Sequence, residues 1–509
     1  MGKPLIGARV ELASNFRGNY SLLQLSSAST FDFSAAYWDQ FSIWISGLNR
    51  IPSRSIYSMK LSHARLMIAV AMSCLVTVAT LSTAGFNGGG GGNRVGGVSI
   101  DPAGVVRTAT VDENQELVNL LRNEVGVAQG DLASAADRRM VSLAGLQRAI
   151  EQSRQSGGRL PAEIRYLAGL TGIDYVFVDK DNNDIVISGP AEPWTISETG
   201  SIVGKESGAA ILQLEDLVVA LRNVENARQA SISCSIESTP EGRKRFMALQ
   251  NRMRLRPGQN PAVFEAAMKE ALGPQVIKLT GIPATSRYAC TMVAADYQMK
   301  RLAMALVDSP VRELPSYLQM ARNGSHAGNR NPRWWMACDY DSLTRNEEGT
   351  VWKLTGQGIK TKTEQDVIAE DGSTSSEASD KLAQKWADSM TEHFTDLASK
   401  MPIFGELQNL MDLTVVSTLI VQENLEHHAG LDLAVLRDQE TLAPQMFEAP
   451  QKIAPECSFI KGRSGWVVTA SGGVSVDAFP VVHDQKVDAE LDGQLVAAKS
   501  DAWWWNDAR

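Results

Sequence analysis

Apolar residues recur at helical spacing along much of the chain. The clearest stripe consists of Leu214, Leu217, Val218, Leu221 and Val224. Steps of three and four residues place these side chains on one face of a helix, so the stretch is predicted to be an amphipathic helix that packs on a core. The same spacing predicts further helices that begin near residues 143, 161, 240 and 261.

Alternating patterns predict strands between these helices. Apolar residues and serines alternate strictly across Ile232–Ile236, which gives that strand one buried face. Two β-rich runs on either side of Asp179–Asp184 predict a β-hairpin, and Gln275–Thr280 and Tyr288–Val293 are predicted as single strands. This order is typical of an α+β fold, with an antiparallel-containing sheet and helices packed over it.

A stretch rich in glycine and asparagine, 323–331, is the predicted boundary between two regions. The first is an α+β domain at 96–322, and the second is another α+β region at 332–482. Strands are predicted at 332–340 and 351–354, where tryptophan, valine and other strand-forming residues gather.

A long helical hairpin and a C-terminal β-meander complete the second region. The two helices are predicted to meet at Met401–Pro402, and the second, 403–426, is apolar nearly all round and therefore expected to be buried. The meander is predicted between residues 457 and 479. The segment 370–379, just before the hairpin, is polar and acidic, which predicts a mobile loop.

An uncharged apolar stretch, Leu66–Ala84, indicates export. It follows the basic residues Lys60 and Arg65 and ends in small residues, which together are the three parts of a secretory signal peptide. Cleavage is expected between Ala84 and Gly85. An uncleaved membrane anchor is the alternative, because about 20 apolar residues can span a bilayer. The glycines that follow favour cleavage, after which no stable membrane span is expected.

This leader divides the N-terminal part of the chain. With 59–84 as the signal peptide, residues 1–58 are interpreted as an upstream extension that results from a start assigned too early. Residues 85–95 are interpreted as a glycine-rich tether. The mature protein is expected in the periplasm or outside the cell.

Charge narrows the classes of partner. Removing the 7 basic and 3 acidic residues of 1–84 from the totals of 49 and 58 leaves 42 and 55, a net charge of −13. An acidic protein offers no footprint for a phosphate backbone, so no nucleic-acid partner is expected. The tail 483–509, which carries Trp503–Trp505, is acidic and predicted to be frayed.

Four cysteines follow the predicted cleavage point. In an oxidising compartment an even number invites pairing, and four cysteines allow three connectivities. Lone cysteines at core positions also behave as small apolar residues, so the pairing stays open. These residues are Cys234, Cys290, Cys338 and Cys457.

Several strings resemble a family of predicted secreted planctomycete proteins that is catalogued only as a domain of unknown function. They are IVISGPAEPW at 185–194, AADYQMKRLAM at 294–304, NPRWWM at 331–336 and the start of the first long helix at 383–393. The likeness extends over 96–482. It implies export, and it transfers no activity, cofactor or catalytic residue.

Candidate metal sites lack the required ligands. Asp179, Asp181 and Asn183 imitate the start of an EF-hand loop, but Asp184 and Pro190 stand where that loop needs glycine and glutamate. The stretch is therefore predicted to be a solvated turn. His393 lies too far along the helical hairpin from the histidines at 427 and 428 to share a metal ion with them. No metal and no cofactor are predicted.

Carboxylates and aromatic residues gather between 334 and 352. Asp339 and Asp341 lie near Trp334, Trp335 and Trp352, a combination that sugar-binding clefts use. The competing interpretation is a sheet face with the tryptophans in the core and the acids in a turn.

Two functional hypotheses follow. The first is a non-catalytic binding or cell-envelope-associated protein whose partner is an envelope protein or a polysaccharide. The alternative is a secreted hydrolase, possibly carbohydrate-acting, centred on Trp334–Trp352, with Asp339 and Asp341 as its candidate catalytic residues and Trp334, Trp335 and Trp352 as its candidate binding residues.

Overall fold

The computed structural model describes residues 94–504, except 158, 255, 257–258, 322–329, 369–373, 379–380, 461–465, 469 and 495–501. All described residues belong to one compact unit, Leu81–Arg509. The predicted leader 59–84, its cleavage point and the upstream extension lie outside the described residues. Across the described ranges, every helix falls short of the length and apolarity that crossing a lipid bilayer requires.

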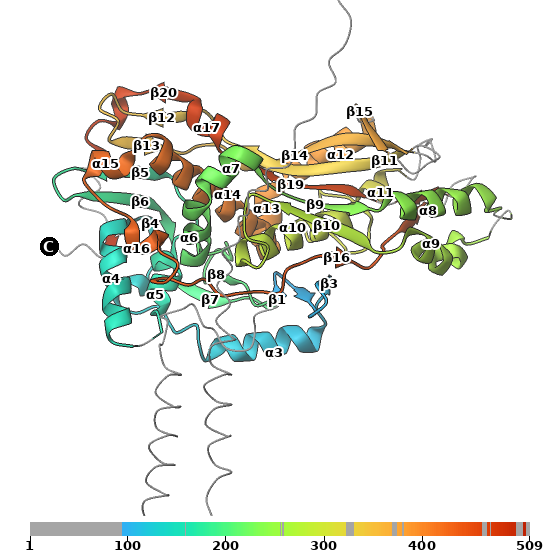
Figure 1. The fold of residues 1–509 in the computed structure, drawn as a ribbon, viewed down its shortest axis with the longest axis horizontal. Coiled ribbons are helices and arrows are strands. Elements are labelled where there is room, and N and C mark those ends of the chain that lie inside the picture. Colours follow the sequence, from blue (N-terminus) through green and yellow to red (C-terminus); the bar gives the residue numbers. More distant parts are fainter. Residues whose placement is uncertain are drawn as a thin grey trace, which may run out of the picture. The chain divides into compact units, whose positions relative to one another are not determined.

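The larger sheet of the described residues is mixed and has ten strands (Figure 1). Its pairs are antiparallel except β3 with β16 and β11 with β19, which are parallel. In spatial order the strands are β1 (Arg94–Val95), β2 (Val98–Ile100), β3 (Val105–Thr108), β16 (Lys452–Ile453), β10 (Gln275–Thr280), β9 (Ile232–Ser238), β19 (Ser471–Val476), β11 (Arg330–Asp339), β14 (Gly358–Ile368) and β15 (Thr374–Ala378).

A second sheet has seven described strands and contains the predicted β5–β6 hairpin. Two short hairpins, β7 (Trp194–Ile196) with β8 (Ile202–Gly204) and β17 (Ser458–Ile460) with β18 (Trp466–Val468), stand apart from both sheets. The order in the second sheet is β20 (Gln485–Val487), β12 (Leu343–Arg345), β13 (Val351–Lys353), β5 (Tyr175–Asp179), β6 (Asp184–Ala191), β4 (Ala136–Ser142) and β21 (Ala502–Trp504).

Helices lie between and around these sheets, so the chain has an α+β fold, as its sequence predicts. Their bounds are α3 (Val111–Arg122), α4 (Leu143–Gln155), α5 (Ala162–Arg165), α6 (Leu214–Arg222), α7 (Val224–Ala230), α8 (Pro240–Arg252), α9 (Glu265–Leu272), α10 (Arg287–Ala303), α11 (Tyr317–Ala321), α12 (Lys381–Glu392), α13 (Phe394–Lys400), α14 (Pro402–Gln422), α15 (Leu425–Ala429), α16 (Ala434–Arg437) and α17 (Phe479–His483). Short 3-10 turns cover Gly130–Ala133, Leu167–Gly169, Pro261–Phe264 and Ala489–Leu491.

Helix α14 is the central helix of the core. It begins at Pro402, where the proline occupies the first helical turn and needs no backbone donor. From Leu410 to Ile420 every residue is buried, because α6, α10, α13 and α17 all pack against this helix. The predicted corner at Met401–Pro402 and the buried second helix are confirmed.

Strands from both predicted regions share each sheet. The larger sheet places β19 between β9 and β11, and the smaller one pairs β13 with β5. One continuous apolar core also runs from Val95 to Val482. The regions on either side of 323–331 are therefore consecutive in the chain but not separate in space.

The segment predicted as a strand at Tyr288–Val293 is helical, and that prediction was wrong. It lies in α10, where the Ser286 hydroxyl caps the first turn by accepting from the Ala289 N–H. Tyr288–Ala295 is buried throughout, because α10 packs against α14, β9 and β19. Because small or apolar residues cover nearly all sides of this part of α10, it has no separate apolar stripe that the sequence could reveal.

The C-terminal segments also differ from the predicted meander and mobile loop. β17 and β18 form a hairpin, but β19 leaves it and enters the larger sheet. Thr374–Ala378, inside the predicted mobile loop, is strand β15 and pairs with β14. Part of the tail expected to be frayed is also ordered, since β20 pairs with β12 and β21 pairs with β4.

Candidate functional site

The tryptophans predicted as sugar platforms are core residues. Trp334 is 0% exposed and Trp352 is 1% exposed. The Trp334 ring meets that of Trp386 edge-on at 4.6 Å between centroids, and its Nε1 donates to the Ala383 carbonyl at 3.3 Å. Trp352 belongs to the other sheet. The two rings therefore neither share a surface nor offer a face to a ligand.

The neighbouring groups do not assemble a site around them. Trp335 is partly exposed, but the Arg333 guanidinium covers its ring at 4.8 Å from the centroid. Asp339 forms an ion pair with Lys360 on the next strand, and Asp341 is exposed. Asp339 and Asp341 do not converge with the tryptophans on a shared cleft. The arrangement therefore gives no support to acid–base chemistry on a sugar.

All four cysteines of the described residues are free thiols. Burial raises the pKa of Cys290 and of Cys338 to about 12, and that of Cys457 to about 11. Such thiols are poor nucleophiles at neutral pH, because the thiolate is the reactive form. They pack as small apolar residues.

The acidic turn at 179–184 is less solvated than predicted. Asp179 is 3% exposed and Asp184 is 7% exposed. Asp184 accepts hydrogen bonds from the Ser142 hydroxyl and from the Ala144 N–H, so it fixes the start of α4 on β6. Burial raises its pKa despite these hydrogen bonds. No cluster of three or more metal-ligating side chains occurs in the described part of the chain.

A cavity of about 120 Å³ lies beside the N-terminal end of α6. Its walls come from β1, α3, the end of α5, the turn between β7 and β8, the N-terminal parts of α6, α10 and α14, and the segment with Gln445 and Phe447. We name it the Glu215 cavity; the side chains that matter most to its chemistry are Arg94, Leu117, Arg165, Glu215, Arg287 and Glu406.

Arg287 joins three helices at the wall of this cavity. Its Nη1 forms an ion pair with Asp216 of α6, and its Nη2 lies 2.6 Å from Glu406 Oε2 of α14. The side chains are only 11%, 3% and 3% exposed. Burial opposes the charge of Arg287, but the two carboxylates outweigh burial and raise its pKa. This guanidinium is therefore a fixed cation that is already neutralised.

Glu215 is the group of this cluster that brings an unsatisfied atom to the cavity. Asp216 Oδ1 also lacks a partner among the described residues, but Asp216 is not a lining residue. Glu215 is 5% exposed and accepts a hydrogen bond from the Gln445 backbone. Its Oε1 has no partner among the described residues. Burial, and then the charge of Asp216, raise the pKa of Glu215 to about 8, although Arg287 lowers it. The carboxyl group is thus mainly protonated at neutral pH, and one oxygen is available to a ligand.

Other buried carboxyl groups lack this combination. Asp412 accepts at one oxygen from the Tyr340 hydroxyl, at 2.5 Å, and at the other from the Ile173 N–H, at 3.3 Å. Asp296 forms an ion pair with Lys300 at 2.8 Å beneath the larger sheet. Burial raises the pKa of Asp412 to about 7 and that of Asp296 to about 6. Neither residue lines the Glu215 cavity, so both act within the core.

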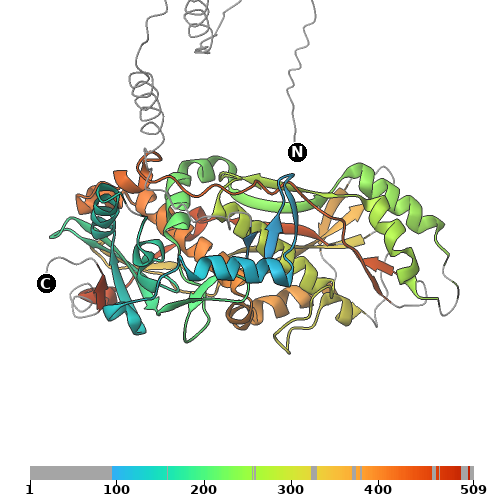
Figure 2. The ribbon, with the colours of Figure 1, turned by 90° about the horizontal axis from the view of Figure 1, so that it is seen from below.

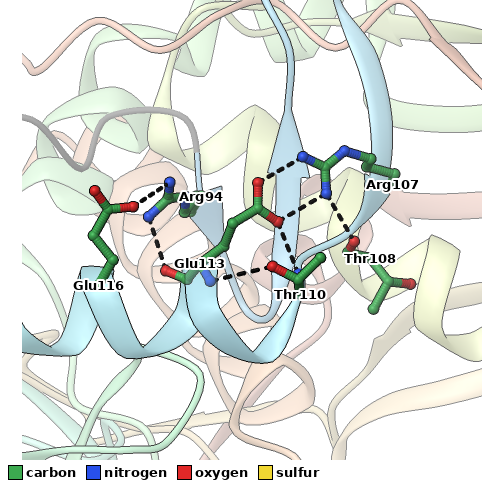
Figure 3. A network of polar contacts seen from close by, with 6 residues as sticks. All are labelled: Arg94, Arg107, Thr108, Thr110, Glu113 and Glu116. Atoms are coloured by element: carbon green, nitrogen blue, oxygen red, sulfur yellow. Dashed lines mark hydrogen bonds and ion pairs between the residues drawn. The ribbon is translucent and has the colours of Figure 1, made fainter.

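A surface network fixes α3 against β1 and β3 (Figure 3). Arg107 binds the Glu113 carboxylate through both terminal nitrogens, at 2.6 and 2.8 Å. Glu113 also accepts from the Thr110 N–H, and the Thr110 hydroxyl accepts from the Glu113 N–H, which completes a capping box. Arg107 and these hydrogen bonds lower the pKa of Glu113 to about 2.

The fixed α3 helix supplies the apolar wall of the cavity. Figure 2 shows α3 on the outside of the unit, next to β1–β3. Arg94 of β1 donates to the Glu113 carbonyl and pairs with Glu116 at 3.0 Å. Leu117 of α3 faces the cavity and approaches Gly200 so closely that a Cβ there would lie 2.5 Å from Leu117 Cδ2. The β7–β8 turn therefore needs glycine at 200, where φ is +84°.

Comparison with known proteins adds a family match. Residues 234–317 match the family described as Protein of unknown function (DUF1598). No curated protein and no solved structure matches the chain.

The DUF1598 segment supplies part of the site. It extends from β9 to the start of α11 and contains Arg287. Glu215, Asp216 and Glu406, which surround that arginine, lie outside it. The cavity is therefore completed by elements on both sides of the matched segment.

Sequence analysis did not identify this site. The Leu214–Val224 stripe is confirmed, but Glu215 and Asp216 belong to the face of α6 that an isolated amphipathic helix turns to water. A usable signal was present in the second long helix. That helix is predicted to be buried on all sides, yet it contains Glu406 and Asp412, and a buried carboxylate requires a partner.

Proposed function

We propose that the protein binds a small polar ligand in the Glu215 cavity. The observation that supports this proposal is Glu215 Oε1, a buried polar atom that faces a cavity without a hydrogen-bond partner among the described residues. An unsatisfied buried polar group costs about 1–3 kcal/mol. A ligand or an ordered water molecule recovers that energy, and the cavity has room for either.

The alternative of a carbohydrate-acting hydrolase at Trp334–Trp352 is not proposed further. Trp334 and Trp352 are buried in different sheets, so neither ring is free to stack on a sugar. Binding at the Glu215 cavity keeps the non-catalytic hypothesis and transfers it to another part of the chain.

A thermal-unfolding panel tests ligand binding. The probes are methylammonium, acetate, glycine, L-alanine and glucose, each added to the full chain over a range of concentrations. At least one is expected to raise Tm with concentration, because a probe at about 100 times its Kd adds about 2.7 kcal/mol of stability. For every probe except acetate, which carries no hydrogen-bond donor for Glu215, the shift should fall strongly in Glu215→Gln and persist in Glu151→Gln, which changes an exposed residue of α4. An unchanged Tm with every probe would contradict the proposal.

We also propose that the protein works after export, in the periplasm or outside the cell. The basic start, the apolar run and the small residues before Gly85 support this proposal. Mass spectrometry of protein recovered from its native cells, compared between cell fractions, is expected to show an N-terminus at Gly85 outside the cytoplasm. Recovery from the cytosol of an intact chain that begins at Met1 would contradict the proposed export.

A further inference from the structure

Three polar atoms of residues that line the Glu215 cavity have no hydrogen-bond partner among the described residues: Glu215 Oε1, Arg165 Nε and the Ser201 hydroxyl oxygen. The first two are of opposite kind, since Glu215 Oε1 is an oxygen and Arg165 Nε is a donor. The hydrogen-bonding groups of the cavity that are free to meet a ligand are therefore an acidic oxygen, a cationic N–H and a neutral hydroxyl.

Arg165 is the cavity cation whose charge remains available. Its Nη2 donates to the Glu124 carbonyl, at 2.5 Å, and its guanidinium lies over the Tyr166 ring, 5.1 Å from the centroid. Neither contact neutralises the charge. Arg287 is paired with two carboxylates, and Arg94 is paired with Glu116 on α3. An anionic group that enters the cavity therefore finds Arg165 unoccupied.

The inner end of the cavity carries an excess of carboxyl groups. Glu215, Asp216 and Glu406 surround the single guanidinium of Arg287. In a buried site, one cation compensates the negative charges of two carboxylates incompletely, and those of three carboxylates even less completely. The proton on Glu215 relieves the excess when the cavity is empty. A ligand cation placed at Glu215 Oε1 would replace that proton.

We infer that the ligand is a small zwitterion, an α-amino acid or a compound with the same two ends. Its ammonium group binds Glu215, and its carboxylate binds Arg165. Leu117, Leu121 and Ile202 form an apolar wall that suits a small side chain. This inference rests on the proposed function, because it names the chemical class that the Glu215 cavity takes.

A proton should leave the site when such a ligand binds. The charged groups around Glu215 are Asp216 on the same helix, Arg287 of α10 and Glu406 of α14. The other walls of the cavity add Arg94, Glu124 and Arg165. Burial raises the pKa of Glu215 to about 8, so the carboxyl group holds its proton at pH 7. An adjacent ammonium favours the ionised carboxylate and lowers that pKa. Acetate alone brings no cation to Glu215 and should release no proton.

Isothermal titration calorimetry of the full chain measures the contributions of the ammonium end and of the carboxylate end of the ligand separately. L-Alanine, methylammonium and acetate are titrated at pH 7 in two buffers of different ionisation enthalpy, which reveals proton release. L-Alanine is expected to bind at least about tenfold more tightly than either half, since each charge-assisted hydrogen bond adds roughly that factor. Its binding should release up to one proton per site.

Two variants with matched controls show which residue binds which end of the ligand. Glu215→Gln should weaken the binding of L-alanine and of methylammonium about tenfold or more and leave the affinity for acetate unchanged. Arg165→Gln should weaken L-alanine and acetate and leave methylammonium unchanged. The controls are Glu151→Gln and Arg154→Gln, both on the exposed face of α4, and they should change none of the three affinities. Far-UV circular dichroism confirms that each variant is folded.

The outcomes distinguish this inference from the proposed function. If methylammonium binds as tightly as L-alanine and Arg165→Gln changes neither affinity, the ligand is a simple cation and the inference of a zwitterionic ligand is wrong. If only glucose binds, a polar ligand is present but its assigned class is wrong. If no probe binds, the proposed function and the inference fail together.

Discussion

Arg287→Met is expected to lower the free energy of unfolding by about 3–5 kcal/mol at pH 7, or to prevent folding altogether. The substitution leaves Asp216 and Glu406 buried without their cation, each with a side chain only 3% exposed. Urea unfolding followed by circular dichroism measures the loss. The loss should shrink as the pH falls toward 4. Burial raises the pKa of Asp216 to about 6 even beside Arg287, so without that cation the folded variant takes up the Asp216 proton and loses the stranded charge.

A surface pair provides the control. Arg107→Met removes an equally direct ion pair with Glu113, but the Arg107 side chain is 47% exposed, so the expected cost is about 1 kcal/mol or less. If Arg287→Met does not fold, Arg287→Met combined with Asp216→Asn and Glu406→Gln should recover much of the stability, since it removes the stranded charges. A cost for Arg287→Met alone that does not exceed that of Arg107→Met would refute the buried network.

Trp334→Ala is expected to cost about 3–5 kcal/mol, because it opens a cavity in a closely packed core. The ring lies between Trp386 and Tyr317, with centroid distances of 4.6 and 5.1 Å, and none of it is exposed. Thermal and urea unfolding of the full chain give the value. A sugar-binding platform would behave differently, since an exposed ring can be removed at little cost to stability.

Trp335→Ala on the same strand is the matched comparison. Its ring points to the other face of β11 and is partly exposed beneath Arg333, so the expected cost is about 1 kcal/mol. Equal costs for the two variants would show that Trp334 is not held in the core as described.

Local sequence patterns predicted most of the individual elements. The strand at Ile232–Ile236, the hairpin around 179–184 and the helix that begins near residue 240 are all confirmed, because each depends on neighbours in the chain. Tyr288–Val293 was assigned to the wrong class because α10 is buried on every side, and its burial comes from segments far away in the sequence.

The candidate site could not be predicted for the same reason. Glu215 becomes buried only when α10 and α14 pack on α6, and the apolar wall arrives with α3. The hypothesis of a sugar site at Trp334–Trp352 was misled by residues that are close in sequence but distant in space. Nearness in sequence suggested a shared surface, but β11 and β13 belong to different sheets, so the two side chains never meet.

The position of β19 has a consequence for how the protein is made. β9 and β11 both require β19 as their neighbour, with Cys234 opposite Val474 and Trp334 opposite Gly472. A ribosome releases β19 only after nearly the whole chain has emerged, so the middle of the larger sheet has to wait. The DUF1598 segment on its own would expose the edges of β9 and β10, which invites aggregation. Such delayed closure would suit the export that we propose, because it would keep the chain unfolded for longer.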